Sequence, residues 1–202
     1  MSRAIVQIGP GDAGKRMRLE DFDHAEGQEG HLYELSRGVI TVMDVPDRKH
    51  LAQLNAARRQ FSAFDLSHPG SIHTIAGGGE CKILLSSEES ERHPDLAIYL
   101  KESTAADDEE FWATWVPEIA VEIVSRGSRQ RDYVEKREEY LKFGVREYWI
   151  IDAESEEMLV LRRSGSRWIE RVIGADQTYR TKLLAGFDFE MGPVFDAARK
   201  AK

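Results

Sequence analysis

The feature that most constrains the fold is a short apolar run, Ile-Ala-Val-Glu-Ile-Val, at residues 119–124. A continuous apolar run without polar alternation is typical of a central strand that is buried on both faces. Glu122 lies within this run, and a buried carboxylate must take up a proton, pair with a cation or bind a metal ion. The alternatives are a strand-end Glu122 that reaches solvent and an ordinary buried ion pair.

The segments around this run predict a domain that mixes helices and strands. Strands are expected over residues 32–43 (as a hairpin), 72–76, 81–85, 96–100, 147–152, 158–163 and 167–173. Helices are expected over residues 18–24, 48–64 and 129–143. Ser128 is the expected N-cap of the last helix and Gly144 its end, whereas the polar stretches 86–92 and 107–110 are expected to be loops or exposed faces. This order predicts an α/β or α+β domain around a mixed sheet, flanked by helices.

Length and composition indicate one domain that folds in water. The chain has 202 residues, 41% of them hydrophobic and 32% charged, which excludes collagen-like and wholly disordered chains. The domain is expected over residues 18–196, with tails at 1–17 and 197–202. Cys81 is the only cysteine, so an intramolecular disulfide and a zinc site built on cysteine pairs are excluded. No apolar run approaches the roughly 18–20 residues that cross a bilayer, and the first residues do not resemble a signal peptide, so a cytoplasmic location without a membrane partner is expected.

Two further groups could meet Glu122 at the sheet. Asp95 opens the strand expected over 96–100, and if that strand lies beside Glu122 the two carboxylates can converge as hard oxygen ligands for Mg²⁺, with Mn²⁺ as a substitute. The alternative for Asp95 is an ordinary turn residue. Asp132 and Lys136 are four residues apart on the charged helix and share one face. The ammonium could polarise an attacking water there, or the pair could be a solvated ion pair worth about 0.3–0.5 kcal/mol.

The charge distribution restricts where a polyanion could bind. Lys and Arg number 28 and Asp and Glu number 36, so the net charge of −8 argues against a general phosphate-binding coat. Residues 126–137 are locally basic, with five cationic and two acidic side chains. Arg126, Arg129 and Arg131 of this segment are therefore the expected contacts to DNA phosphates.

Six short motifs follow one another in a fixed order. They are Tyr-Glu-Leu at 33–35 with Gly38, His-Pro-Asp-Leu-Ala at 93–97, residues 117–125, Arg-Asp at 131–132 with Lys-Arg-Glu at 136–138 and Tyr140, residues 144–152, and Leu-Ala-Gly-Phe at 184–187. Together they resemble the Uma family of restriction endonucleases, a branch of the PD-(D/E)XK nuclease superfamily. The resemblance covers residues 18–196 and implies a restriction-endonuclease-like fold with metal-binding acids on neighbouring strands.

The resemblance also implies roles for individual residues. Asp95 matches the aspartate of the PD motif and Glu122 the acid of (D/E)XK. The lysine expected two residues after Glu122 is Val124, and Lys136 matches an alternative placement of that lysine.

Supporting roles are implied as well. Glu34 matches an acid of the first hairpin that would add a ligand or orient a water, although an exposed hairpin glutamate is the alternative. His50 starts a helix on its apolar face, where a core or capping histidine and a catalytic one are both open.

These observations lead to the hypothesis of a Mg²⁺-dependent endonuclease acting on DNA. Asp95, Glu122 and the backbone carbonyl of Ile123 would hold the metal, Lys136 would steady the nucleophile or the phosphorus centre, and Asp132 would orient Lys136. The resemblance implies 5′-phosphate and 3′-hydroxyl products and a homodimer. The alternative is a nuclease-fold protein without turnover that binds nucleic acid or protein. A nucleotide hydrolase is disfavoured, because the glycines at 77–79 lack the Lys-Ser/Thr of a P-loop.

Overall fold

A six-stranded mixed sheet forms the centre of the molecule. The computed structural model describes residues 5–43, 45–125 and 127–201. In spatial order the strands are β12 (Arg167–Gly174), β11 (Glu157–Ser164), β10 (Glu147–Asp152), β9 (Ile119–Ile123), β8 (Leu96–Tyr99) and β5 (Thr74–Ala76). β9 and β10 are parallel and the other neighbours are antiparallel. β9 is buried at all five positions, as predicted for the apolar run.

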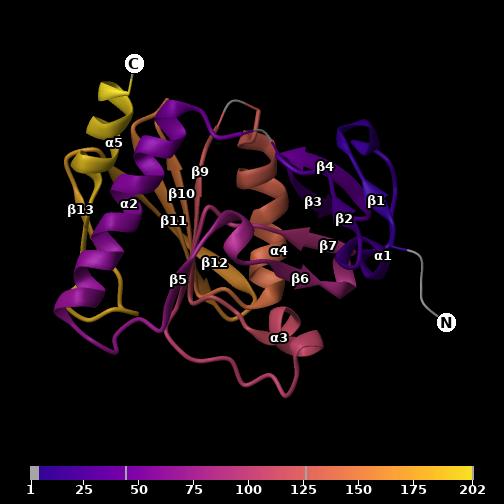
Figure 1. Ribbon diagram of the computed structural model, residues 1–202. Helices are drawn as coiled ribbons and strands as arrows, with labels where there is room; N and C mark the ends of the chain where they lie inside the picture. The colour runs from indigo at the N-terminus through magenta and orange to yellow at the C-terminus, as the bar shows by residue number, and fades with distance from the viewer. Residues whose placement is uncertain (1–4, 44, 126, 202) are drawn as a thin grey trace.

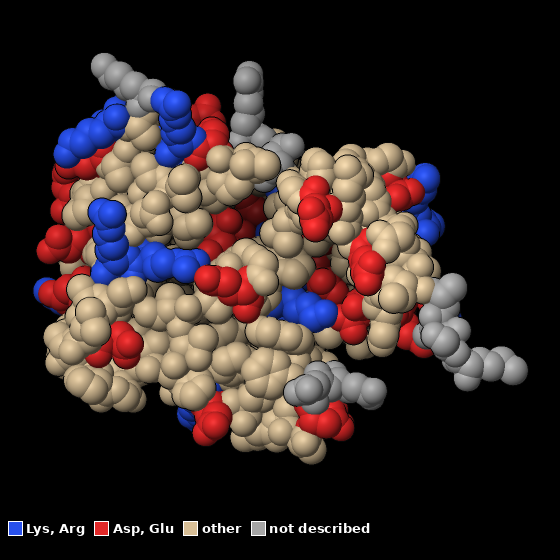
Figure 2. Space-filling view, in the orientation of Figure 1, with Lys and Arg blue, Asp and Glu red and all other residues tan. Residues whose placement is uncertain are grey.

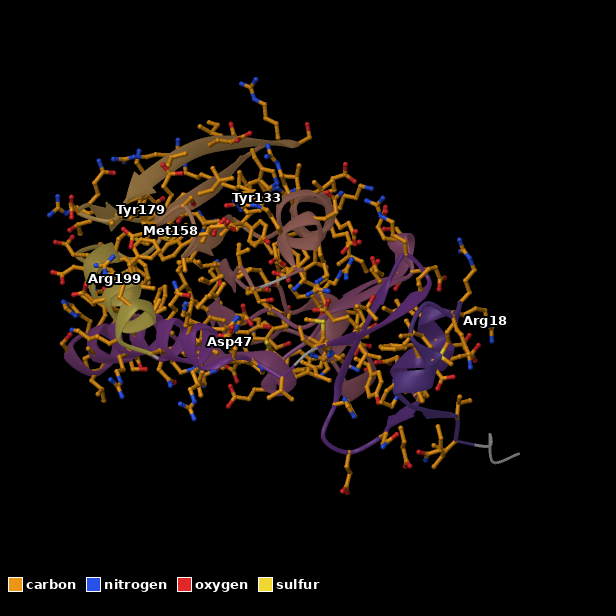
Figure 3. All side chains as sticks on the ribbon, turned by 90° about the horizontal axis from the view of Figure 1, so that it is seen from above. Arg18, Asp47, Tyr133, Met158, Tyr179 and Arg199 are labelled. Atoms are coloured by element: carbon orange, nitrogen blue, oxygen red, sulfur yellow. The ribbon has the colours of Figure 1, made fainter. Side chains whose placement is uncertain are left out.

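Two helices cover one face of this sheet, α2 (Arg48–Ser67) and α5 (Met191–Lys200), which pack against each other (Figure 1). Phe61 of α2 lies 5.6 Å from the ring of Trp149 and 4.7 Å from that of Phe187. Met158 and Tyr179 belong to the same core and lie near α5 in Figure 3. This face is the main apolar core of the protein.

The other face is covered by helix α4 (Lys136–Phe143), which a π-helical turn, η4 (Arg131–Glu135), precedes. Gly144 ends α4 in the left-handed conformation (φ 111°), as predicted. Beyond α4 lies a second sheet with the strand order β4 (Val39–Met43), β3 (Leu32–Ser36), β7 (Ser90–Arg92) and β6 (Ile83–Leu85). Tyr140 of α4 packs between Ile83 and Leu85 of this sheet and Tyr148 of the central one. Helix α4 is therefore sandwiched between the two sheets.

The remaining elements are short and lie at the periphery (Figure 1). They are β1 (Gln7–Ile8), η1 (Pro10–Asp12), α1 (Leu19–Asp23), β2 (Glu26–Gly27), η2 (Gly78–Glu80), η3 (Ser86–Glu88), α3 (Asp108–Thr114), β13 (Thr178–Arg180) and β14 (Asp188–Glu190). None of the helices in the described part of the chain is both long and apolar enough to span a membrane.

The predicted fold class, a mixed sheet flanked by helices with an N-terminal hairpin, is confirmed, but the loop or exposed face predicted over residues 86–92 was wrong at its end, residues 90–92. Residues 86–92 include strand β7, because Glu139 of α4 accepts hydrogen bonds from Ser90 (3.2 Å) and Arg92 (2.6 Å) and so lets these polar residues be buried. The stretch 107–110, predicted as a loop or an exposed face, is exposed at Asp107 and Glu110 and leads into helix α3, whose Phe111 packs on Trp115 (4.9 Å).

The folded chain also extends past the expected boundaries at residues 18 and 196. Ile8 is buried (5% exposed), and α5 continues to Lys200. Cys81 is buried and free, and burial raises the pKa of its thiol to about 12, as expected for a small buried side chain without nucleophilic character.

Candidate active site

Asp95 and Glu122 lie at the same end of two neighbouring strands. Leu96 of β8 pairs with Val121 of the antiparallel strand β9, so Asp95, one residue earlier, and Glu122, one residue later, face each other on one side of the sheet. Asp95 Oδ2 accepts a hydrogen bond from the backbone N–H of Ile123 (2.7 Å), so its side chain is tied to β9 and the simple turn role is wrong.

Lys136 is buried among carboxylates. Its Nζ atom lies 2.9 Å from Glu122 Oε1, 3.2 Å from Glu34 Oε1 and 3.9 Å from Asp132 Oδ1. Tyr140, one turn along α4, donates its hydroxyl to Glu122 Oε1 (2.6 Å). The Lys136 side chain is 1% exposed, so the solvated ion pair considered from the sequence is wrong. The i, i+4 spacing places Asp132, Lys136 and Tyr140 on the face of the helix that meets β9.

Glu34 of β3 completes this cluster from the second sheet. It is fully buried and accepts hydrogen bonds from the backbone of His93 (3.0 Å) and from Arg92 (3.2 Å). Burial alone would raise the pKa of Glu34, but Lys136, Arg92 and the His93 hydrogen bond outweigh it and lower the pKa to about 2. The exposed hairpin glutamate considered from the sequence is therefore excluded.

Glu122 has the opposite electrostatic character. Burial raises the pKa of Glu122 to about 8 although Lys136 lies beside it, because Asp95, Asp132 and Glu34 repel its negative charge. Burial also raises the pKa of Asp132, whose Oδ2 accepts a hydrogen bond from Ser128 Oγ (2.5 Å). The site thus contains four mutually repelling carboxylates and the single ammonium of Lys136. It can therefore bind a further positive charge, either a proton or a cation.

The donor set fits a hard cation only in part. In the described part of the chain, no three His, Cys, Asp or Glu side chains are grouped so that they could hold a metal ion by themselves. Asp95 and Glu122 offer carboxylate oxygens on adjacent strands, and Lys136 and Tyr140 both contact the Oε1 atom of Glu122. Two carboxylates, completed by a carbonyl, waters and substrate phosphate, are the pattern that Mg²⁺ accepts.

His50 supports Asp95 from the start of helix α2. Asp47 caps this helix by accepting a hydrogen bond from the His50 backbone N–H (2.8 Å), and the His50 ring donates from Nε2 to Asp95 Oδ1 (3.1 Å). Burial lowers the pKa of His50, but the bond to Asp95 outweighs it and the net shift is upward. His50 is thus both buried and bonded to a candidate catalytic acid.

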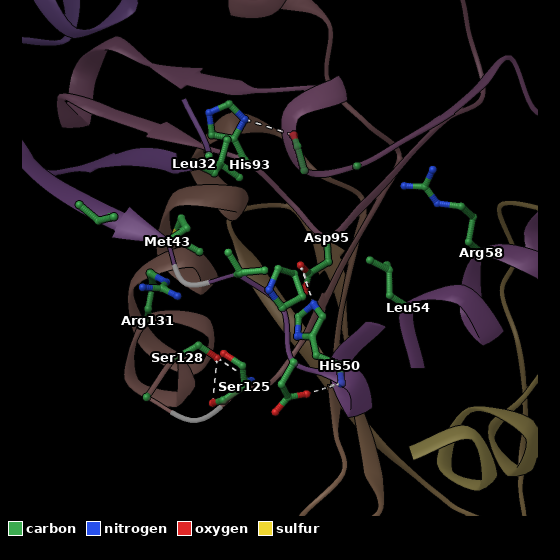
Figure 4. Close-up of a pocket in the computed structure, with 18 residues that line it drawn as sticks. Leu32, Met43, His50, Leu54, Arg58, His93, Asp95, Ser125, Ser128 and Arg131 are labelled. Atoms are coloured by element: carbon green, nitrogen blue, oxygen red, sulfur yellow. Dashed lines mark hydrogen bonds and ion pairs between the residues drawn. The ribbon is translucent and has the colours of Figure 1, made fainter. Parts of the chain in front are cut away.

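A cavity of about 590 Å³ opens beside Asp95 and His50. Figure 4 shows these two side chains between Leu54 on one side and Ser125, Ser128 and Arg131 on the other. In Figure 2 acidic side chains lie at the bottom of a hollow near the middle of one face, with Lys and Arg side chains on either side. Glu122 and Lys136 are only 3% and 1% exposed, so the site opens to solvent mainly at Asp95.

The two described members of the predicted set of DNA contacts, Arg129 and Arg131, have different surroundings. Arg126 lies outside the described residues. Arg129 forms an ion pair with Asp152, and its guanidinium lies 5.1 Å from the centre of the Tyr133 ring. Arg131 lines the cavity instead, with its side chain 20% exposed and its Nε 3.9 Å from Glu34 Oε2.

Two residues of the site were missed from the sequence. Arg92 lay in a polar stretch that was expected to be a loop, and nothing local signals its burial. Tyr140 has a visible signal, because it stands four residues after Lys136 on the same helix face.

Comparisons with known proteins identify the family. The model of the Uma2 family, described as "Putative restriction endonuclease", matches residues 19–192. The chain belongs to this family. At family level the protein is therefore a nuclease. None of the curated proteins in the comparison matches the chain.

The Uma2 fold is also found among solved structures. A "putative nuclease belonging to DUF820" from Anabaena variabilis is similar with a TM-score of 0.71 and 17% sequence identity, over 90% of this chain and 99% of that chain. At this identity the likeness shows a shared nuclease fold.

Val124 marks where this Uma2 chain departs from the (D/E)XK pattern. It lies two residues after Glu122, on the same face of the sheet, and packs in the apolar cluster that contains Tyr140 and Tyr148. The cationic group beside Glu122 comes from Lys136 on the following helix.

The low pKa of Glu34 predicts a loss of stability in acid. The folded-state pKa (about 2) is below the ordinary value of 4.5, so the stabilisation of the fold by ionised Glu34 is complete above about pH 4.5 and lost as the pH falls towards 2. We expect this loss to lower the free energy of unfolding by about 3 kcal/mol, measured by urea denaturation across this pH range. Glu34→Gln should flatten the profile and Glu29→Gln, at an exposed site, should not. Equal acid sensitivity of Glu34→Gln and wild type would contradict this assignment.

Proposed function

We propose that this Uma2 protein is a Mg²⁺-dependent endonuclease that hydrolyses phosphodiester bonds of DNA, with Mn²⁺ as a substitute metal. The observation that carries the proposal is the meeting of Asp95, Glu122 and Lys136 at one end of the central sheet. Two acids for a divalent cation and a cation for the phosphate are groups that metal-assisted phosphodiester hydrolysis can use.

Each residue has a role in this proposal. Asp95, Glu122 and the carbonyl of Ile123 would hold the ion, which when bound supplies a water of lowered pKa and positive charge at the scissile phosphate. Lys136 orients Glu122 through its 2.9 Å contact and adds positive charge for the transition state. Asp132 helps to hold the ammonium. In-line hydrolysis would break the bond between phosphorus and the 3′ oxygen, which takes up a proton, and would give a 5′-phosphate and a 3′-hydroxyl.

His50 and Glu34 are positioning residues. His50 fixes the Asp95 carboxylate by its 3.1 Å hydrogen bond, and Glu34 holds Lys136 from the opposite side to Glu122. Both act through another residue of the site and need no contact with DNA.

A binding protein without turnover is the second candidate. The burial of Glu122 and Lys136 favours it, since a paired and enclosed acid and base can serve stability alone. Such a protein would bind DNA in the presence of Mg²⁺ and leave it intact.

Plasmid nicking separates these two candidates. Supercoiled DNA is incubated with the protein in Mg²⁺, Mn²⁺, Ca²⁺ or EDTA, with Asp95→Ala as the control. We expect conversion to nicked and linear DNA in Mg²⁺ and Mn²⁺ that both EDTA and Asp95→Ala abolish. Binding in a gel-shift assay without nicking in either metal would support the second candidate.

Arg131 is the proposed phosphate contact of the cavity. Arg131→Ala should weaken binding to all DNA sequences and reduce the slope of log affinity against log salt by about one contact. Arg129→Ala is the comparison, and it should change the slope less because Asp152 already neutralises Arg129. A salt-dependence slope that changes for Arg129→Ala and not for Arg131→Ala would place the DNA beside Arg129 and Tyr133 instead of in the cavity.

We also propose a homodimer, because two sites related by a two-fold axis can cut both strands of a duplex. Sedimentation at micromolar protein concentration tests this. A monomer at every concentration would contradict it.

A further inference from the structure

The lining of the cavity beside Asp95 mixes polar and apolar side chains. The polar ones include Asp95, His50 and Arg131. The apolar ones come from the β3–β4 hairpin, the segment after it and helix α2; they are Leu32, Val42, Met43, Val45, Pro46 and Leu54. Figure 4 shows Leu54 across from Arg131, with Asp95 between them. Cavities of roughly 300–1,000 Å³ with an apolar lining and a few polar groups suit ligands of this mixed character.

Two residues that line this cavity each carry a buried polar atom without a hydrogen bond to the described residues. They are the Nδ1 atom of His50 and the Nε atom of Arg131, which lies 3.9 Å from Glu34 Oε2, beyond hydrogen-bond distance. Buried polar atoms are nearly always satisfied in folded proteins, so unsatisfied ones beside a cavity point to a ligand that supplies the missing partner. An anionic oxygen would satisfy the N–H of Arg131.

The cationic groups of the cavity are too few for a long stretch of duplex. Arg58 and Arg131 are its Lys or Arg residues in the described part of the chain, and Arg58 is paired with Glu80 (3.2 Å). The protein as a whole carries a net charge of −8, whereas duplex-binding surfaces are strongly positive. The cavity can therefore hold one or two phosphates of a single strand.

The apolar side chains of the cavity need a different partner from the phosphates. In a matched duplex both faces of each base are covered by its stacked neighbours, and only an unpaired base can lay a face against aliphatic side chains. Val45 lines the cavity and is 78% exposed, so apolar surface is available to such a base.

We propose that this cavity is a subsite for one unpaired nucleotide next to the scissile phosphate, with the base against Leu54 and Val45 and a phosphate at Arg131. The preferred substrate is then single-stranded DNA, or duplex with an unpaired nucleotide at the cut. This inference rests on the proposed endonuclease function and defines its substrate class.

Binding of three DNA probes tests the subsite separately from cleavage. The probes are a single strand, its matched duplex and the same duplex with one unpaired nucleotide, compared by fluorescence anisotropy in Ca²⁺, with the DNA checked for integrity on a gel. We expect the single strand and the unpaired probe to bind about ten-fold more tightly than the matched duplex. Leu54→Asn should remove this preference, and Leu66→Asn, 82% exposed at the far end of the same helix, should keep it.

Val45→Asn is a second test, at a residue whose substitution does not disturb the packing of the main core. Leu54 also packs against the main core, whereas Val45 is exposed, so Val45→Asn keeps the fold and should weaken the preference too. Equal affinity for all three probes, or a preference that both variants retain, would overturn the inference.

Cleavage assays of the same probes in Mg²⁺ distinguish a failure of this inference from a failure of the proposed endonuclease function. Cleavage of matched duplex as fast as that of the unpaired probe keeps the endonuclease and removes the subsite. A binding preference that depends on Leu54 and Val45, without cleavage of any probe, keeps the subsite and removes the endonuclease.

Discussion

Replacing Lys136 by Met should reduce both the stability of the protein and its rate of DNA cleavage. The substitution removes the ammonium and keeps a side chain of similar length, so Glu122 and Glu34 lose a buried partner at 2.9 Å and 3.2 Å. Leaving buried charges without compensation costs about 3–5 kcal/mol in the free energy of unfolding. The cleavage rate should fall by about 10²-fold or more, because a positioned charge beside the reacting phosphate is lost.

Lys142→Met is the matched control on the same helix. Lys142 is 52% exposed and pairs with Glu88 (2.7 Å), so its loss should cost no more than about 1 kcal/mol and leave cleavage intact. Urea denaturation gives the stability, and single-turnover cleavage is measured at a temperature where circular dichroism shows both variants folded. Cleavage by Lys136→Met within a few-fold of wild type would remove Lys136 from the mechanism. Unchanged stability would contradict the buried cluster.

The central strand and the shared helix face of Asp132 and Lys136 could be predicted from local sequence. An uninterrupted apolar run indicates burial on both faces, and it correctly placed Glu122 at the centre of the sheet. The spacing of Asp132 and Lys136 correctly indicated a shared helix face. Both inferences depend on backbone geometry over a few residues.

The burial of the cluster could not be predicted in this way. Lys136 is enclosed because Glu34 reaches it from β3, about a hundred residues earlier in the chain. Arg92 is buried because Glu34 and Glu139 approach it from two different elements, although its own segment has the composition of a loop. These contacts depend on how the second sheet packs on α4, which local sequence does not encode.

The site assignments depended on motif order rather than on pattern alone. Asp95 on its own is compatible with a turn, and it was singled out by its position at the start of a strand expected beside Glu122 and by its match to a family motif. The structure ties Asp95 to β9 through Ile123 and to α2 through His50. Its catalytic role stays a prediction.

Replacing Asp95 by Asn should abolish cleavage and weaken Mg²⁺ binding while leaving the fold intact. Asn keeps an oxygen that can accept the hydrogen bond from the Ile123 N–H, and its NH₂ group can donate to Nε2 of the other neutral tautomer of His50, so we expect little change in stability without metal. Loss of a ligand charge should lower the cleavage rate by about 10³-fold or more, equivalent to about 4 kcal/mol of transition-state stabilisation. Asp47→Asn is the matched control, since Asp47 lines the same cavity and Asn caps helices as well as Asp.

The melting temperature measured against Mg²⁺ concentration separates metal binding from other causes of inactivity. Wild type and Asp47→Asn should be stabilised as Mg²⁺ rises, because the ion binds the folded chain, and Asp95→Asn should not. Since the pKa of Glu122 is about 8 without metal, Mg²⁺ must displace a proton below that pH. The stabilisation should therefore grow as the pH rises through 8. Equal stabilisation of Asp95→Asn and wild type, independent of pH, would place the bound Mg²⁺ away from Asp95 and Glu122.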